Sequence, residues 1–202
     1  MTHRRFLPTE LAALVAILLL AAVFRYWQIA EYPKALHFDE AINGLVTQDL
    51  RRGHLPQLLT YNDAREPLIY YLMAGPVAIF GPTPGALRVA TATVSLLLVG
   101  GVFLLSRGFF GRKVASITAL VCATTVWPIY HGRLATRSIL VPLVVSLALY
   151  CGLVAWRDRR LWWWIIAGLL FGAVFYTYAT NLFIIPAIGL TIAGLTAFNR
   201  RG

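Results

Sequence analysis

The stretch ILVPLVVSLALYCGLVAW, residues 139–156, runs for eighteen residues without a charged side chain. A helix rises about 1.5 Å per residue, so about 20 apolar residues cross the hydrocarbon core of a bilayer. The chain is 59% hydrophobic with a mean hydropathy of +0.71, whereas soluble domains are about 45–50% apolar. The stretch therefore predicts a transmembrane helix in a membrane protein.

Five more apolar stretches lie on either side of this one. They cover Leu11–Ile29, Ala86–Ser106, Val114–Tyr130, Leu161–Ala179 and Leu182–Phe198. Together with Ile139–Trp156 they predict an all-α, polytopic transmembrane helical bundle of about six spans. We expect residues 1–202 to form one integral membrane domain, because no internal repeat and no soluble domain separates the stretches.

The charged residues predict how the bundle is oriented. The net charge is +10, but the basic residues mark the ends of apolar stretches rather than one patch, which argues against a nucleic-acid partner. Lys and Arg of short loops stay on the cytoplasmic side. Placing the clusters around Arg107 and Arg157 there leaves both termini cytoplasmic and residues 30–85 as a long outer loop. We expect the protein to lie in the plasma membrane of a bacterium or an archaeon.

Two short helices are expected within the outer loop. Glu66–Phe80 is apolar but only fifteen residues long, and Pro67 and Gly81 suit the two ends of a helix. In Ala41–Leu50, one helical face carries Ile42, Leu45, Val46 and Leu50. Both segments are too short to span and predict amphipathic juxtamembrane helices at the bilayer surface, in contact with membrane lipids.

Three side chains that could take part in catalysis or metal binding lie just before the segment Ala41–Leu50. Asp39 is a candidate catalytic base that removes a proton from an acceptor hydroxyl, and Glu40 is the second carboxylate of the pair. The structural alternatives are that Asp39 caps the helix and that the negative charge of Glu40 stabilises its first turn through the helix dipole. His37, Asp39 and Glu40 are also candidate ligands of a divalent metal ion.

Three arginines are expected on the same outer face, namely Arg88, Arg133 and Arg137. Arginine binds phosphate through paired, charge-assisted hydrogen bonds, and arginines are less expected outside than inside. We therefore predict that these three contact a lipid-linked phosphate; the alternative is that they reach ordinary headgroups. Tyr61, also in the outer loop, is a candidate to stack on a sugar, with the interfacial aromatic belt as its alternative.

The ordered set of motifs resembles the N-terminal half of the GT-C membrane glycosyltransferases, closest to the protein O-mannosyltransferase and aminoarabinose transferase group (family 39/83-like). The motifs are His37-Phe38-Asp39-Glu40, the Glu66–Leu72 segment EPLIYYL, Phe80-Gly81 with Leu87-Arg88, Phe110–Lys113 and Gly132–Arg137. Members of that family have more spans, so the resemblance implies a truncated form.

This resemblance implies transfer of a sugar from a polyprenyl-phosphate donor to a protein, lipid or glycan acceptor on the non-cytoplasmic face. Asp39 aligns with the catalytic aspartate of the first loop, and Arg88 and Arg137 are candidates to contact the donor phosphate. Two alternatives remain open, a non-catalytic membrane subunit that retains the fold and, with less support, a transporter. A transporter is less favoured because nearly every charge maps to the end of a span.

Overall fold

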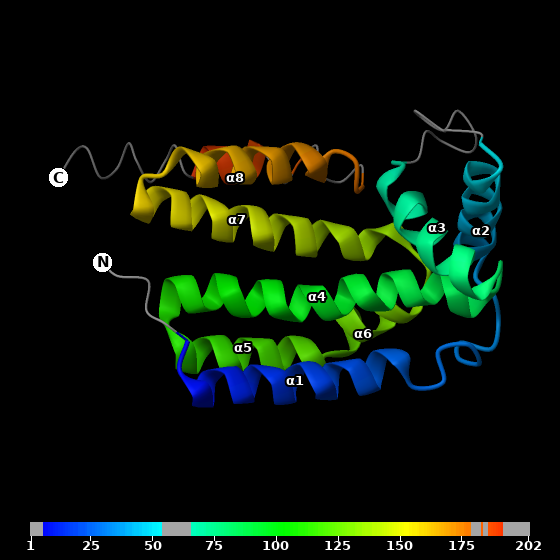
Figure 1. Cartoon of the computed structure of the whole chain (residues 1–202), viewed down its shortest axis with the longest axis horizontal. Helices are drawn as coiled ribbons and strands as arrows, with labels where there is room; N and C mark the ends of the chain where they lie inside the picture. Colours follow the sequence, from blue (N-terminus) through cyan, green and yellow to red (C-terminus); the bar gives the residue numbers. More distant parts are fainter. Residues whose placement is uncertain (1–5, 54–65, 179–182, 184–185, 192–202) are drawn as a thin grey trace.

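The computed structural model describes residues 6–53, 66–178, 183 and 186–191, and every regular element in these ranges is helical. Five helices run roughly parallel to one another in Figure 1, namely α1 (Pro8–Tyr26), α4 (Pro84–Phe110), α5 (Arg112–Thr124), α7 (Leu140–Asp158) and α8 (Leu161–Val174). Two others, α2 (Phe38–Arg51) and α3 (Leu68–Phe80), stand across one end of this bundle. The predicted all-α bundle is confirmed.

The two ends of the bundle differ in chemistry. We call the end that carries α2, α3 and residues 27–37 and 134–136 the loop end (right in Figure 1). At the opposite end, α4 turns into α5 and α7 turns into α8. We call it the basic end, because it carries the exposed side chains of Arg112, Lys113, Arg157, Arg159 and Arg160.

Three described helices are long and apolar enough to cross a bilayer. They are α1, α4, and α7 taken together with the 3₁₀ turn η1 (Arg137–Ile139) that precedes it. They contain the predicted spans Ala86–Ser106 and Ile139–Trp156 and most of Leu11–Ile29. The predicted span at Leu161 is shorter than expected, since α8 ends at Val174 after 14 residues. Most of Leu182–Phe198 lies outside the described residues, so six spans are not confirmed.

The stretch Val114–Tyr130, predicted as one span, is divided between α5 and α6 (Val126–Arg133), which meet at an angle of 52°. The cause is Pro128, which has no N–H to offer the carbonyl of Thr124 and whose ring would collide with it. Thr125 takes extended backbone angles at the break. If this bent pair crosses as one unit, the described chain has up to four spans.

Arg25 of α1 fills the gap that this break leaves. Its guanidinium is fully buried and donates to the carbonyls of Cys122 (3.3 Å) and Ala123 (3.1 Å), which lie at the end of α5. Its Nε–H also donates to Ser95 Oγ of α4, at 2.8 Å. A cation at the carbonyl end of a helix is favourable, so Arg25 stabilises the broken span by joining three helices.

Helix α4 is the centre of the fold and packs against α1, α3, α5, α6 and α7. It starts at Pro84, where the hydroxyl of Thr83 accepts the N–H of Ala86 at 3.2 Å. It ends at Phe110, and the positive φ of 84° at its C-cap, Gly111, allows the chain to reverse directly into α5. An ion pair between Glu10 and Arg107 attaches the start of α1 to the end of α4.

The two juxtamembrane helices form where the sequence predicts them. Helix α3 ends at Phe80, with Gly81 as its C-cap, and buries Ile69, Tyr70, Met73 and Val77. Helix α2 starts earlier than expected, with His37 as its N-cap, and its inward face differs from the predicted one. Leu45 is 64% exposed, whereas Glu40, Asn43 and Thr47 are buried beside Val46 and Leu50. Polar contacts of Glu40 and Asn43 across the loop end turn this face inward.

Candidate functional site

Glu40 and Arg88 form a buried ion pair at the centre of the loop end. Arg88 donates its Nε–H to one carboxylate oxygen of Glu40 at 2.8 Å and an Nη–H to the other at 3.1 Å. The two side chains are 0% and 2% exposed. A carboxylate and a guanidinium paired in this two-point geometry attract each other strongly, and burial limits screening by water.

The same two side chains also bind backbone groups of the segment before α2 and of the segment after α6. The remaining N–H groups of Arg88 donate to the carbonyls of Ile29, Pro33 and Ala35, at 3.4, 2.9 and 3.4 Å. Glu40 accepts the backbone N–H of His37 and that of Ala135, each at 3.0 Å. We call Glu40, Arg88 and these backbone groups the loop hub. It closes residues 29–37 against the residues that follow α6.

The loop hub explains the charge state of Glu40. Burial by itself would raise the pKa of this carboxyl group. The hydrogen bonds from Arg88, His37 and Ala135 act in the opposite direction and hold the pKa of Glu40 below its ordinary value. Glu40 is therefore an anion with four hydrogen-bond donors, which is the environment of a positioning residue rather than of a proton carrier.

Asp39 lies in the first turn of α2, beside the hub but not inside it. Its side chain is 42% exposed, and one carboxylate oxygen lies 4.0 Å from Nδ1 of His37. The backbone N–H of Asp39 donates to the same ring nitrogen at 3.3 Å, because His37 caps the helix. The predicted pair is thus divided: Glu40 is fully buried, while Asp39 presents its carboxylate at the surface of the loop end.

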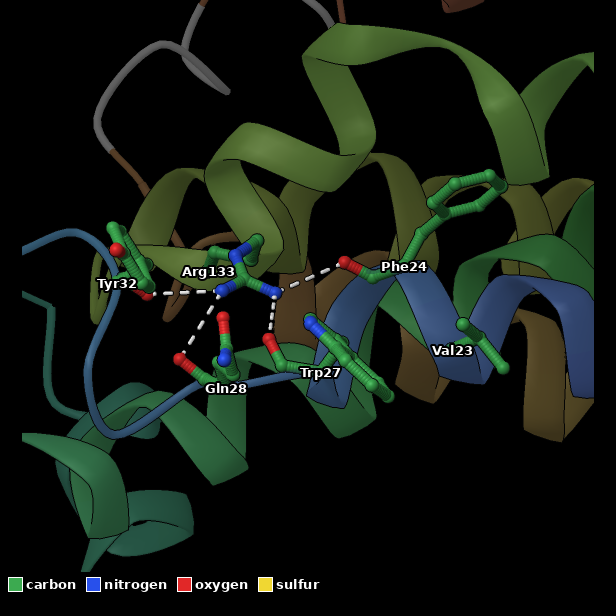
Figure 2. A pocket seen from close by; sticks show the side chains of 6 residues that line it. All are labelled: Val23, Phe24, Trp27, Gln28, Tyr32 and Arg133. Atoms are coloured by element: carbon green, nitrogen blue, oxygen red, sulfur yellow. Dashed lines mark hydrogen bonds between the residues drawn. The ribbon is translucent and has the colours of Figure 1, made fainter.

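The guanidinium of Arg133 binds backbone carbonyls at the end of α1 and in the residues that follow it. Its Nη–H groups donate to the carbonyls of Phe24, Arg25 and Trp27, at 3.1, 3.4 and 2.8 Å, and to those of Gln28 and Tyr32, at 3.4 and 3.1 Å. Figure 2 shows the guanidinium pointing at the carbonyl oxygens of Phe24, Trp27, Gln28 and Tyr32, on one side of an open cavity of about 490 Å³. Arg133 therefore caps a helix whose last carbonyls have no partner within the helix.

Arg137 has different surroundings from the other two predicted arginines. One Nη atom lies 3.0 Å from a carboxylate oxygen of Glu66, and the guanidinium lies over the ring of Tyr178, 4.9 Å from its centre. Next to it, Ser138 Oγ and His131 Nδ1 are 3.0 Å apart. The segment that leads into α3, the turn before α7 and the residues after α8 therefore meet at this guanidinium.

Residues 64–201 match the family model described as dolichyl-phosphate-mannose-protein mannosyltransferase. The chain belongs to this family. It is an integral membrane protein of a glycosyltransferase family, as its apolar helices and the match together show. No curated protein matches the chain. The match includes Glu66, Arg88, Arg133 and Arg137 but begins after α2, so the catalytic role of Asp39 stays a prediction for this mannosyltransferase-family chain.

The predicted metal site has only two of the side chains it needs close together. In the ranges that the structure describes, no three His, Cys, Asp or Glu side chains are grouped so that they could hold an ion. Glu40, the third predicted ligand, is committed to Arg88, and Nδ1 of His37 accepts a backbone N–H. His37 and Asp39 supply fewer ligands than the three or four protein side chains of a zinc site, so we derive no step through a metal. Tyr61 lies outside the described residues.

Three residues of the loop end were missed by sequence reasoning. Glu66 was assigned only to a helix start, and Arg25 only to an aromatic cluster at the membrane surface. A charge inside an apolar stretch is a signal that could have identified Arg25, because such residues need a partner. Asn43, whose side chain donates to the carbonyl of Ala135 at 2.6 Å, gave no signal in the pattern of α2.

Proposed function

We propose that the chain transfers a sugar from a polyprenyl-phosphate donor to an acceptor hydroxyl at the loop end, which faces the non-cytoplasmic side. The family supports the class of reaction. The exposed cations of the basic end support the orientation, because such residues favour the cytoplasmic side. The observation that carries the proposal is the half-exposed carboxylate of Asp39 beside a buried hub that fixes the helix on which it stands.

The proposed reaction is an inverting displacement. Asp39 removes the proton of the acceptor hydroxyl, and the acceptor oxygen forms a bond to the anomeric carbon of the sugar. The bond between that carbon and the phosphate oxygen breaks, and its electron pair leaves with the polyprenyl phosphate. Arg137 stabilises the negative charge that grows on this phosphate. Glu40 and Arg88 act as positioning residues, because all five N–H groups of Arg88 are hydrogen-bonded in the hub.

The test is sugar transfer by the full chain in liposomes supplied with a polyprenyl-phosphate-linked mannose and a mixed pool of acceptor peptides and lipids. Replacing Asp39 with Asn should reduce turnover by on the order of 10²–10⁴-fold, the usual contribution of a general base. Binding of the donor should change little, because the substitution removes a charge but leaves the hub intact.

The matched control is Asp49→Asn in the same helix. Asp49 forms an exposed ion pair with Arg52 at 3.5 Å, and such surface pairs contribute little. We expect turnover of this variant to equal that of the unmodified chain. Equal turnover of the Asp39 variant would remove the base from the proposal, and a folded chain that transfers no sugar to any acceptor would contradict the proposed function.

A further inference from the structure

The three arginines predicted to bind phosphate differ in how their N–H groups are used. Five hydrogen bonds use every N–H group of Arg88, and five use the two Nη atoms of Arg133. Within the described ranges, the guanidinium of Arg137 makes one ion pair, with Glu66, and one cation–π contact, with Tyr178. Of these three, Arg137 is therefore the one that can offer N–H groups to an incoming anion without dismantling the loop end.

The contact between Arg137 and Glu66 is close but poorly aligned. The side chains are 21% and 13% exposed, and the nearest nitrogen and oxygen are 3.0 Å apart. Those two atoms are buried, and neither has an aligned hydrogen bond among the described residues. A buried donor and a buried acceptor held in this way lose the hydrogen bonds that they would make with water. The pair is therefore less stable than the two-point pair of the loop hub.

A phosphate group matches a guanidinium better than this carboxylate does. Two phosphate oxygens can accept two parallel N–H groups, which gives shorter and stronger hydrogen bonds than a single misaligned contact. The face of the Tyr178 ring, which attracts the cation, keeps the guanidinium in place while its partner changes.

We propose that Glu66 occupies the phosphate position on Arg137 until a polyprenyl phosphate arrives, and that the lipid phosphate then replaces the carboxylate. This inference rests on the proposed function, because it assumes that the loop end receives such a lipid. It assigns Glu66 a role as a competitor that sets donor affinity. No covalent bond changes in this exchange.

The test measures binding of decaprenyl phosphate to the full chain purified in a neutral detergent. Replacing Glu66 with Gln removes the competing charge and keeps the shape, so the dissociation constant should fall about tenfold. Arg137→Gln should raise it by about tenfold or more. In the double variant the gain from Glu66→Gln should vanish, because the gain acts through Arg137. Glu66→Ala provides a second variant should Glu66→Gln not fold.

The matched controls are Glu31→Gln and Lys34→Gln, which remove charges from exposed side chains at the same end and should leave binding unchanged. Phosphatidylglycerol and inorganic phosphate are titrated in parallel to identify the source of the phosphate. Tightening for decaprenyl phosphate supports the exchange, while tightening for phosphatidylglycerol alone overturns it. No binding, or equal binding by the Glu66 variants, also overturns it.

The readout separates this inference from the proposed function. Tightening by Glu66→Gln in a chain that transfers no sugar would retain the exchange and reject the reaction. Sugar transfer that depends on Asp39, without any tightening, would retain the reaction and reject the exchange.

Discussion

The loop end and the basic end both carry many cations, but they use them differently. At the basic end, Arg112, Lys113 and Arg160 are exposed, as expected of residues that keep a loop on one side of a membrane. At the loop end, Arg25, Arg88 and Arg133 donate to Glu40, to Ser95 and to backbone carbonyls at helix ends and in the 29–37 loop. An arginine at the loop end therefore indicates a ligand site only where its N–H groups are not already bonded within the protein.

The largest effect should come from Arg88→Met, which leaves Glu40 buried without its cation. Removing one partner of a buried ion pair typically costs about 3–5 kcal/mol of unfolding free energy. Arg112→Met at the basic end is the matched control and should stay within about 0.5 kcal/mol of the parent. Thermal unfolding in detergent, followed by tryptophan fluorescence, measures both variants.

A double variant sharpens this comparison. Combining Arg88→Met with Glu40→Gln removes both charges, so it should be less destabilising than Arg88→Met alone. Equal melting temperatures of Arg88→Met and Arg112→Met would show that the two ends do not differ in the way we describe.

Glycine substitutions should give a smaller difference between the ends. A Cβ on Gly132, near the loop end, would lie 2.5 Å from Cβ of Ser95, an atom that cannot move without its backbone. We expect Gly132→Ala to cost about 1–3 kcal/mol, the usual range for overpacking.

The control is Gly108→Ala, near the basic end. Its Cβ would meet a terminal methyl carbon of Leu153 at 2.6 Å, and that flexible side chain can rotate away. The melting temperature of Gly108→Ala should therefore lie closer to that of the parent than the melting temperature of Gly132→Ala does, and the reverse order would contradict the packing described for α4 and α6.

Acid should produce the smallest of these effects. The pKa of Glu40 is lowered in the folded chain. Its ionised form therefore stabilises the fold at pH values above 4.5, the ordinary pKa of this group. That contribution is lost as the pH falls below this value and through the folded-state pKa. The stability advantage of the parent over Glu40→Gln should therefore shrink between about pH 7 and about pH 3.

The control for this titration is Glu31→Gln, whose side chain is exposed. Its melting temperature should follow that of the parent at every pH. An advantage of the parent over Glu40→Gln that stays constant into acid would show that the hub does not depend on the ionised carboxylate.

Much of the fold follows from local patterns in the sequence. Apolar length predicts α1, α4 and α7, and Pro67 and Gly81 predict the bounds of α3, because proline and glycine restrict or free the backbone at single positions. The break at Thr125 was missed, although Pro128 alone supplies its cause. Of the candidate site, the pattern identified Asp39 and Glu40 as a pair of acids but could not separate their roles, since burial depends on what packs against the helix.

The sequence alone determined that this chain is a helical membrane protein with carboxylates and arginines gathered at one end. Hydrophobic length and charge at helix ends are local properties, and the bilayer converts them directly into spans and loops. Only the tertiary structure decided which arginine meets which acceptor. Glu40 reaches Arg88 and the N–H of Ala135, 48 and 95 positions away in the chain, and no periodicity encodes a distance of that kind.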